Sequence, residues 1–285
     1  MSVRLFAQAF SGALADVLTH PAESLEWYWL GQAGFLLRGP NYTWLIDPYL
    51  SDRLADKYRG KPLSHVRMMP APVAVSQIGR VDLVLCTHRH GDHLDQPTLE
   101  NIAEQNPKAR FVLPAGIKQE IAEFQLPRGN IFWAVPDQPL KYGPLTITAL
   151  PAAHEAFGYD EAGHHKFVGY SCLFAERSIY HSGDTVLYPG LTHRLRTAGP
   201  DVALLPVNGR RAELLAQGIA GNLSLEEAIA LSVEAGIPNL LAHHFGLFAF
   251  NTIDPRLIDA ASRTVADKLT LVRAELGKRY YLRNS

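Results

Sequence analysis

Three histidines and an aspartate lie within six residues directly after an apolar run, and this feature constrains the fold most strongly. The run 81–86 predicts a buried strand, and it is followed by His88, His90, Asp92 and His93 in the spacing H-x-H-x-D-H. Side chains two residues apart in an extended segment point to the same side, so His88 and His90 can reach one metal ion. A polar surface loop and a chance histidine cluster are the alternatives. The density and order of these residues favour metal binding.

One loop supplies too few ligands for a metal site, so other strand ends should carry histidines or aspartates. Three later predicted strands do: His154 follows 145–150, Asp184 follows 178–181, and His243 and His244 follow 240–242. Each residue taken alone is more often a hydrogen-bonded histidine or a turn aspartate. Together they indicate two metal sites where several strand ends meet.

The chain has 285 residues, of which 47% are hydrophobic and 19% charged, as in globular proteins. No repeat, low-complexity tract or polar linker divides it, so we expect one domain over residues 1–285. Clustered early strands, followed by strands alternating with helices, indicate an α/β or α+β fold. Strands are predicted at 27–30, 35–38, 43–46, 81–87, 111–113, 131–135, 145–150, 168–175, 178–181, 202–206 and 240–242; helices are predicted near 96–105, 115–124, 188–197, 224–235 and 255–275.

Two predicted helices have clear end signals. Ser224 and Glu227 have the spacing of a capping box, and Gly236 should end that helix. Asp254 and Pro255 predict the start of the next helix. Its apolar face would comprise Leu257, Ile258, Ala261, Val265, Leu269 and Val272. Apolar residues at helical spacing also predict an amphipathic lead helix within residues 1–24, in preference to an export signal.

Charge and cysteine content narrow the classes of partner. The 27 basic and 28 acidic residues nearly cancel, which argues against a nucleic-acid binder. No apolar run reaches the roughly 18 residues that a membrane span needs. The two cysteines, Cys86 and Cys172, lie in apolar runs and form no disulfide framework, so we expect a cytoplasmic protein. A small-molecule substrate is the expected partner, and homo-oligomerisation is left open.

The order of these motifs resembles the metallo-β-lactamase superfamily: H-x-H-x-D-H, then a histidine, then G-D-T, then a final histidine. Asp47, after strand 43–46, occupies the position of that superfamily's early aspartate. More narrowly, residues 27–259 resemble the L-ascorbate-6-phosphate lactonases. The segments that carry this likeness are 29–35, 180–185, 200–210, 221–222 and 244–252.

The resemblance implies a four-layer αββα sandwich with a two-metal site at one edge. By position, it implies that His88, His90 and His154 hold the first metal, that Asp92, His93 and His244 hold the second, and that Asp184 bridges them. His243 and Asp47 would support the ligands from behind. Nitrogen and oxygen donors suit Mn, Zn or Fe, and the family favours Mn, followed by Zn. A hydroxide held by the metal pair would attack an acyl carbonyl, with Asp92 able to shuttle the proton.

Substrate recognition has weaker signals. Asn208 and Arg210 follow a predicted strand end, and an arginine fork suits a phosphate or carboxylate, although solvated loop arginines are equally common. Arg89, inside the metal motif, is a second cation that would suit an anionic substrate or simply face solvent. The roles of Arg211, His164 and His165 stay open, and His65 is unassigned.

The leading hypothesis is a metal-dependent hydrolase that opens a lactone or ester of a small anionic, sugar-phosphate-like molecule. The alternative is a metal-dependent phosphodiesterase of the same fold that acts on a nucleotide or phospholipid head group. The third reading, a non-catalytic metal-binding protein, is disfavoured because all seven ligand positions are filled.

Overall fold

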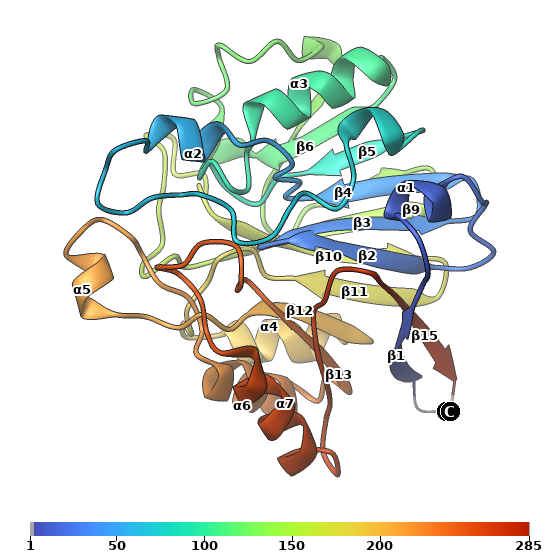
Figure 1. Ribbon diagram of the computed structural model, residues 1–285, viewed down its shortest axis with the longest axis vertical. Coiled ribbons are helices and arrows are strands. Elements are labelled where there is room, and N and C mark those ends of the chain that lie inside the picture. The colour runs from blue at the N-terminus through green and yellow to red at the C-terminus, as the bar shows by residue number, and fades with distance from the viewer. Residues whose placement is uncertain (1–2, 285) are drawn as a thin grey trace.

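The computed structural model describes residues 3–284, which form two β-sheets packed face to face with helices on both outer sides (Figure 1). The four-layer αββα arrangement that the resemblance implies is thus confirmed. The first sheet has the strand order β1-β15-β2-β3-β4-β5-β6-β7, and the second has the order β14-β13-β12-β11-β10-β9-β8.

The first sheet is antiparallel from β1 to β4 and parallel from β4 to β7. Its strands are β1 (Val3–Ala9), β15 (Lys278–Asn284), β2 (Glu26–Gly31), β3 (Gly34–Gly39), β4 (Tyr42–Ile46), β5 (Leu83–Leu85), β6 (Arg110–Pro114) and β7 (Ile131–Ala134). Helices α1 (Leu14–Leu18) and α3 (Gln96–Gln105) pack on its outer face, while α2 (Arg53–Lys57) lies in the loop after β4.

The second sheet is antiparallel from β8 to β11 and parallel from β11 to β14. Its strands are β8 (Pro139–Tyr142), β9 (Leu145–Pro151), β10 (Val168–Phe174), β11 (Arg177–His181), β12 (Val202–Pro206), β13 (Asn239–His243) and β14 (Thr270–Arg273). The helices that follow these strands are α4 (Leu191–Ala198), α5 (Ala212–Leu215), α6 (Leu225–Ala235) and α7 (Pro255–Thr264). Short 3₁₀ turns cover Val75–Gln77, Ala115–Ile117 and Arg128–Asn130.

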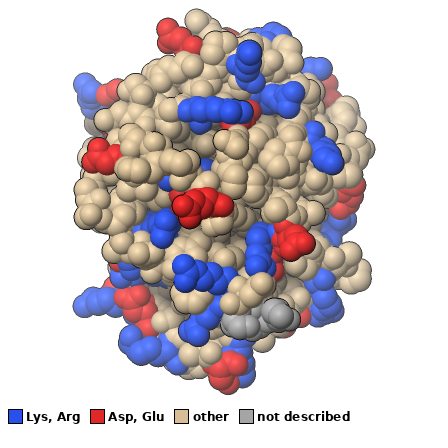
Figure 2. Space-filling view, turned by 90° about the vertical axis from the view of Figure 1, so that its right-hand side faces the viewer, with Lys and Arg blue, Asp and Glu red and all other residues tan. Residues whose placement is uncertain are grey.

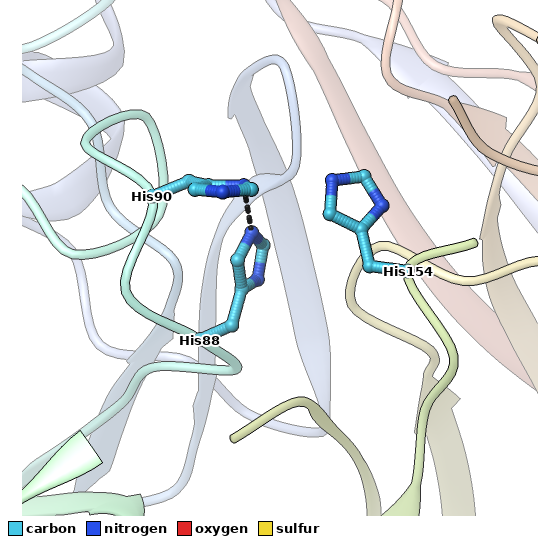
Figure 3. Close-up of side chains that lie close together, drawn as sticks. All are labelled: His88, His90 and His154. Carbon is cyan, nitrogen blue, oxygen red and sulfur yellow. Dashed lines mark hydrogen bonds between the residues drawn. The ribbon is translucent and has the colours of Figure 1, made fainter. Parts of the chain in front are cut away.

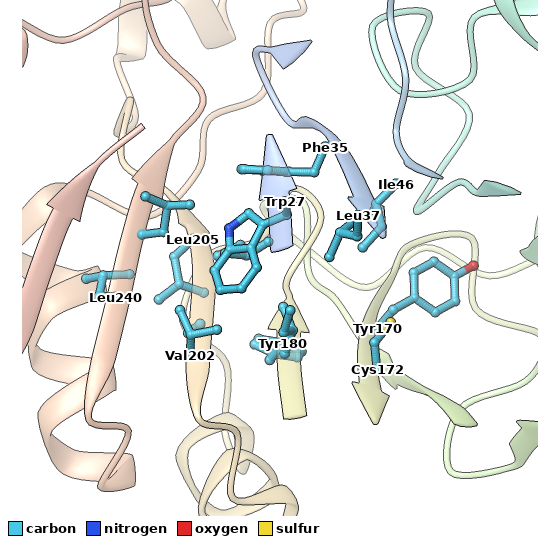
Figure 4. Packing of buried hydrophobic residues seen from close by; sticks show 14 of the residues in the cluster. Trp27, Phe35, Leu37, Ile46, Tyr170, Cys172, Tyr180, Val202, Leu205 and Leu240 are labelled. Atoms are coloured by element: carbon cyan, nitrogen blue, oxygen red, sulfur yellow. The ribbon is translucent and has the colours of Figure 1, made fainter. Parts of the chain in front are cut away.

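The main core fills the space between the two sheets (Figure 4). Phe35 and Leu37 on β3 point into it, whereas Leu36 between them belongs to the cluster under α1 and α3. This alternation follows from the two-residue period of a strand. Tyr170 and Tyr180 pack from the second sheet, so both sheets are covered by apolar layers and their loops are held at a fixed separation.

Two predicted helices differ from the structure. The helix predicted over 255–275 ends at Thr264, and residues 270–273 form β14, which pairs in parallel with β13. Leu257, predicted on the buried face, is 53% exposed, and Val272 lies in the strand. The helix predicted over 115–124 is a single 3₁₀ turn followed by irregular turns. In both segments, strand pairing or loop packing outweighs local helical spacing.

The predicted N-terminal lead helix within residues 1–24 is wrong. Residues 3–9 form β1, which pairs antiparallel with β15 along its whole length, and only the short helix α1 follows. The backbone groups of β1 gain partners from the other end of the chain, a contact that local apolar spacing cannot reveal. Residues 1, 2 and 285 lie outside the described part. Within residues 3–284 the longest helix has 11 residues, so none has the length of a membrane span.

A buried ion pair attaches the segment after α1 to the first sheet. Arg38 Nε donates to Glu26 Oε1 at 2.7 Å, and both side chains are buried. The same guanidinium donates to the carbonyls of Val17 and His20 at 3.1 and 2.8 Å. Arg38 therefore compensates the Glu26 charge and also the carbonyl groups that α1 leaves free at its end.

We expect Arg38→Met to lower the free energy of unfolding by about 3–5 kcal/mol, because it removes the buried cation nearest to the Glu26 carboxylate, which keeps only the Tyr28 hydroxyl at 2.7 Å and Arg279 at 3.5 Å. Urea unfolding followed by circular dichroism measures the change. The double variant Glu26→Gln with Arg38→Met should recover part of the loss. A single variant as stable as wild type would show that the pair contributes nothing.

Candidate metal centre

The loop after β5 folds so that its histidines face one point. The amide of His93 donates to the carbonyl of His90 at 3.0 Å, which closes a turn and brings His93 beside His88. A Cβ at Gly91 would lie 2.8 Å from a methyl carbon of Leu54, so a larger residue here would displace that side chain. The sequence spacing H-x-H-x-D-H thus becomes a compact group of side chains at the sheet edge.

The first group comprises His88, His90 and His154, whose ring nitrogens lie within 4.8 Å of one another (Figure 3). His88 Nε2 and His90 Nδ1 are 3.0 Å apart. His154 comes from the loop after β9, in the other sheet. Burial, followed by the neighbouring histidine rings, lowers the pKa of His88 well below its usual range. Neutral imidazoles that converge in this way are suited to a cation.

The second group comprises Asp92, His93 and His244, again within 4.8 Å. Asp184, from the loop after β11, lies between the two groups. Its Oδ1 is 3.3 Å from His93 Nε2 and 3.1 Å from His244 Nε2, and its Oδ2 is 3.8 Å from His154 Nε2. One carboxylate therefore reaches both groups.

Asp47, after β4, supports this arrangement from behind. Its carboxylate accepts hydrogen bonds from the Thr87 amide at 2.8 Å and the Thr87 hydroxyl at 2.6 Å, and it lies 2.7 Å from His93 Nδ1. The hydrogen bond to Asp47 places the proton of neutral His93 on Nδ1, so its Nε2 lone pair points at Asp184. Asp47, which the resemblance implies supports the ligands from behind, thus contacts His93 on the side away from Asp184.

The donor set fits a cation. His93 Nε2 and Asp184 Oδ1 are buried, face each other and have no hydrogen-bond partner within residues 3–284. Burial lowers the pKa of His93, but the carboxylates of Asp184, Asp47 and Asp92 outweigh it and raise that pKa well above its usual range. The positive charge between His93 Nε2 and Asp184 Oδ1 is therefore either a proton on His93 or a metal ion that replaces this proton. Burial raises the pKa of Asp184, but the charges of His244 and His93 outweigh it and hold that pKa well below its usual range. The carboxylate is therefore ionised, as a metal ligand must be.

The adjacent histidines His243 and His244 have different surroundings. His243 ends β13 and points between the sheets, where it stacks on His181 with ring centroids 5.0 Å apart and packs edge-on against Phe35. His244 has a left-handed backbone, with φ at 66°, which turns its ring toward Asp184. The structure thus places His244 in the cluster and His243 behind it.

Gln32 was missed by the sequence analysis as a site residue. It lies in the turn between β2 and β3, and its Nε2 donates to Asp92 Oδ2 at 3.0 Å. Its backbone carbonyl accepts from the His244 amide at 3.0 Å. The segment 29–35 carried the family likeness, but no spacing rule links Gln32 to residues so distant in the chain.

The floor of a cavity of about 300 Å³ is formed by five residues of the metal centre: His90, Asp92, His154, Asp184 and His244. Its walls include Lys57, Tyr58, His65, Arg89, Phe248 and Phe250. Neither Lys57 nor Arg89 forms an ion pair within residues 3–284, so two free cations border the cavity. On the face shown in Figure 2, by contrast, basic and acidic side chains are interspersed.

The predicted substrate-binding residues do not line this cavity. Both ends of the Asn208 amide are engaged inside the protein, by Asn251 at 2.7 Å and Asn222 at 3.1 Å. Arg210 pairs with Glu227, the capping-box residue of α6, and donates to the Asn222 carbonyl. Arg210 lines a separate hollow and pairs with Glu227 there, so the structure does not bring it to the metal-centre cavity.

The other open residues also lie off the cavity wall. Arg211 donates to the carbonyl of Phe250. His164 contacts Asp160, and His165 packs on Phe157 and Tyr159. In the described part of the chain, Arg211, His164 and His165 thus contact other protein groups and do not face the metal-centre cavity.

Comparisons with known proteins agree with this geometry. A family model, the beta-lactamase superfamily domain, matches residues 42–245. A UPF0173 metal-dependent hydrolase of Hyperthermus butylicus is 31% identical over 186 residues, which cover 64% of this chain and 70% of the relative. An N-acyl-phosphatidylethanolamine-hydrolyzing phospholipase D 1 of Caenorhabditis elegans is 24% identical over 248 residues, 82% of this chain and 67% of that protein. The chain spans only 52% of the length of uncharacterized mycobacterial relatives.

Among solved structures, the isothiocyanate hydrolase from Delia radicum gut bacteria has a TM-score of 0.70 at 18% identity, covering 91% of this chain and 99% of that one. At this identity the likeness shows the fold alone. None of these relatives is named as an ascorbate-6-phosphate lactonase, so the narrower resemblance finds no support here. The family model spans most of the chain, and the protein is a metal-dependent hydrolase that belongs to the metallo-β-lactamase superfamily and, within it, to the UPF0173 family.

Proposed function

We propose that this protein binds two divalent metal ions and hydrolyses an ester or lactone of a small anionic molecule. The observation that carries the proposal is the position of Asp184, whose two oxygens face the two ligand groups. Two divalent ions about 3.5–4 Å apart act together on one bond, and a carboxylate between them offsets their repulsion.

In this proposal, His88, His90 and His154 hold one ion and Asp92, His93 and His244 hold the other. Imidazole and carboxylate donors suit Mn, Zn or Fe. When bound, such ions supply Lewis acidity, which makes water a stronger nucleophile and polarises an acyl carbonyl.

Asp92 would transfer the proton of the attacking water, and Gln32 would hold Asp92 in position. Burial raises the pKa of Asp92, but the neighbouring His93 and His244 outweigh this effect and lower that pKa, so Asp92 is ionised. Its Oδ2 is held by the Gln32 amide at 3.0 Å. Asp92 would therefore accept the proton of the attacking water and return it to the leaving oxygen.

The charge of the cavity supports an anionic substrate. Lys57 and Arg89 border it without a carboxylate partner, and neither is neutralised by the described residues. Cations beside a small cavity attract anions and raise their local concentration. In this proposal, Lys57 and Arg89 attract the anionic group of the substrate, the role that the sequence suggested for Arg210.

A phosphodiesterase is the second candidate, supported by the likeness to a relative named as a phospholipase D. The same ions could activate water against phosphorus. The cavity volume of about 300 Å³ lies at the lower end of small-molecule sites. It would accommodate a head group but not a whole phospholipid.

Metal analysis tests the first part of the proposal. Protein purified without chelator, then reconstituted with Mn or Zn, should contain close to two metal equivalents per chain, because each ligand group offers three side chains. Removal by a chelator should abolish activity, and adding either ion back should restore it. Stoichiometry that stays below one equivalent after reconstitution would contradict the paired site.

Single substitutions test the ligand assignment. Asp184→Ala should lose both ions and nearly all activity, since it removes the group that reaches both sites. His244→Ala should empty one site, whereas His243→Ala should keep both ions and lose activity by about 10–100-fold at most, as supporting residues do. Metal content and circular dichroism are measured together. An empty second site in His243→Ala with a filled one in His244→Ala would reverse the assignment.

A substrate panel separates the two candidate reactions. Metal-loaded protein should open γ-butyrolactones and cleave anionic esters faster than bis-4-nitrophenyl phosphate. Among esters, mono-4-nitrophenyl succinate should be preferred to the neutral 4-nitrophenyl butyrate, and the double variant Lys57→Met with Arg89→Met should lose that preference. Faster phosphodiester cleavage would favour the second candidate, and an unchanged preference in the double variant would remove the role of the two cations.

A further inference from the structure

His65 is a buried histidine on the cavity wall that the proposed reaction does not use. It is 7% exposed and lines the same cavity as Asp92. Its ring stacks on Tyr58 with centroids 4.0 Å apart, and it meets the rings of Phe248 and Phe250 at 5.0 and 4.8 Å. Three aromatic neighbours therefore fix the plane of the imidazole.

One hydrogen bond of the His65 ring determines which of its two nitrogens can accept a further hydrogen bond. Nδ1 lies 2.9 Å from the carbonyl oxygen of Leu63, and a carbonyl can only accept, so Nδ1 carries the proton. Nε2 of the neutral ring is then an acceptor, and it has no partner within residues 3–284. Burial lowers the pKa of His65, which favours this neutral form.

An aromatic box of this kind does not require a histidine. A phenylalanine would pack equally well between Tyr58, Phe248 and Phe250 and would bury no polar nitrogen. The small exposed part of His65 lies on the cavity wall, and Nε2 is not among the fully buried nitrogens that lack a partner. A hydrogen-bond donor inside the cavity can therefore reach Nε2.

We propose that His65 determines substrate specificity by accepting, at Nε2, a hydrogen bond from a hydroxyl group of the substrate. This inference rests on the proposed function. An ester or lactone has no N–H group at the bond that is cleaved, so a hydroxyl group is the hydrogen-bond donor that we expect such a substrate to carry. The substrate class is therefore a hydroxylated ester or lactone. A site built to bind a hydroxyl discriminates strongly against analogues that lack it.

The test compares matched probes on metal-loaded protein. The probes are γ-butyrolactone and its 2-hydroxy and 3-hydroxy derivatives, and the variants are His65→Phe and His65→Gln. His193→Phe is the matched control, because His193 is exposed on α4, away from this cavity. Wild type should prefer at least one hydroxylated lactone in kcat/KM by about tenfold or more, as one lost hydrogen bond predicts.

In His65→Phe this preference should fall to near one, while the metal content and the melting temperature stay close to wild type. His65→Gln, which keeps an acceptor oxygen, should retain part of the preference, and His193→Phe should retain all of it. Equal rates for all three lactones in wild type, or an undiminished preference in His65→Phe, would overturn the inference.

Calorimetric binding of the ring-opened products separates this inference from the proposed function. 2,4-Dihydroxybutyrate and 3,4-dihydroxybutyrate are compared with 4-hydroxybutyrate, so no turnover is required. Tighter binding of a dihydroxy acid, lost in His65→Phe, would support His65 even if no lactone is hydrolysed, in which case only the lactonase proposal fails. A hydroxyl bound by the metal alone would keep its advantage in His65→Phe and would count against the inference.

Discussion

Parallel pairing in the middle of each sheet is the constraint on which the metal centre depends. β4 pairs in parallel with β5, and β11, β12 and β13 pair in parallel with one another. Carboxyl ends of parallel neighbours lie at the same sheet edge, so the loops after these strands converge. Asp47, His88, Asp184 and His244 all occupy such loops. The packed core between the sheets fixes the distance between the two halves of the centre.

The sequence was sufficient for the floor of the site because each of its residues follows an apolar run. Residues that directly follow the strands in the sequence therefore lie together at the sheet edge in the structure. Pairing between strands that are distant in the sequence could not be predicted. No residue near β1 indicates that it pairs with β15. Likewise, residues 270–273 form β14 because they pair with β13, although local spacing predicted a helix there. Arg210 followed a strand end as expected, but its partner Glu227 lies 17 residues later on α6.

The walls of the cavity were harder to predict than its floor. Lys57 and His65 come from the long loop around α2, and Phe248 and Phe250 come from the loop after β13. These residues meet only because both loops cover the same edge. His243 and His244 illustrate how fine the geometry is: one residue separates a histidine packed between the sheets from one that faces Asp184, and the left-handed turn at His244 makes the difference.

Anomalous diffraction from crystals of Mn- or Zn-loaded protein would show whether Asp184 lies between two metal ions, as we propose. We expect two anomalous peaks about 3.5–4 Å apart, with an Asp184 oxygen beside each. One peak should lie beside His88, His90 and His154, and the other beside Asp92, His93 and His244. A single peak, or two peaks of which neither contacts Asp184, would contradict this proposal.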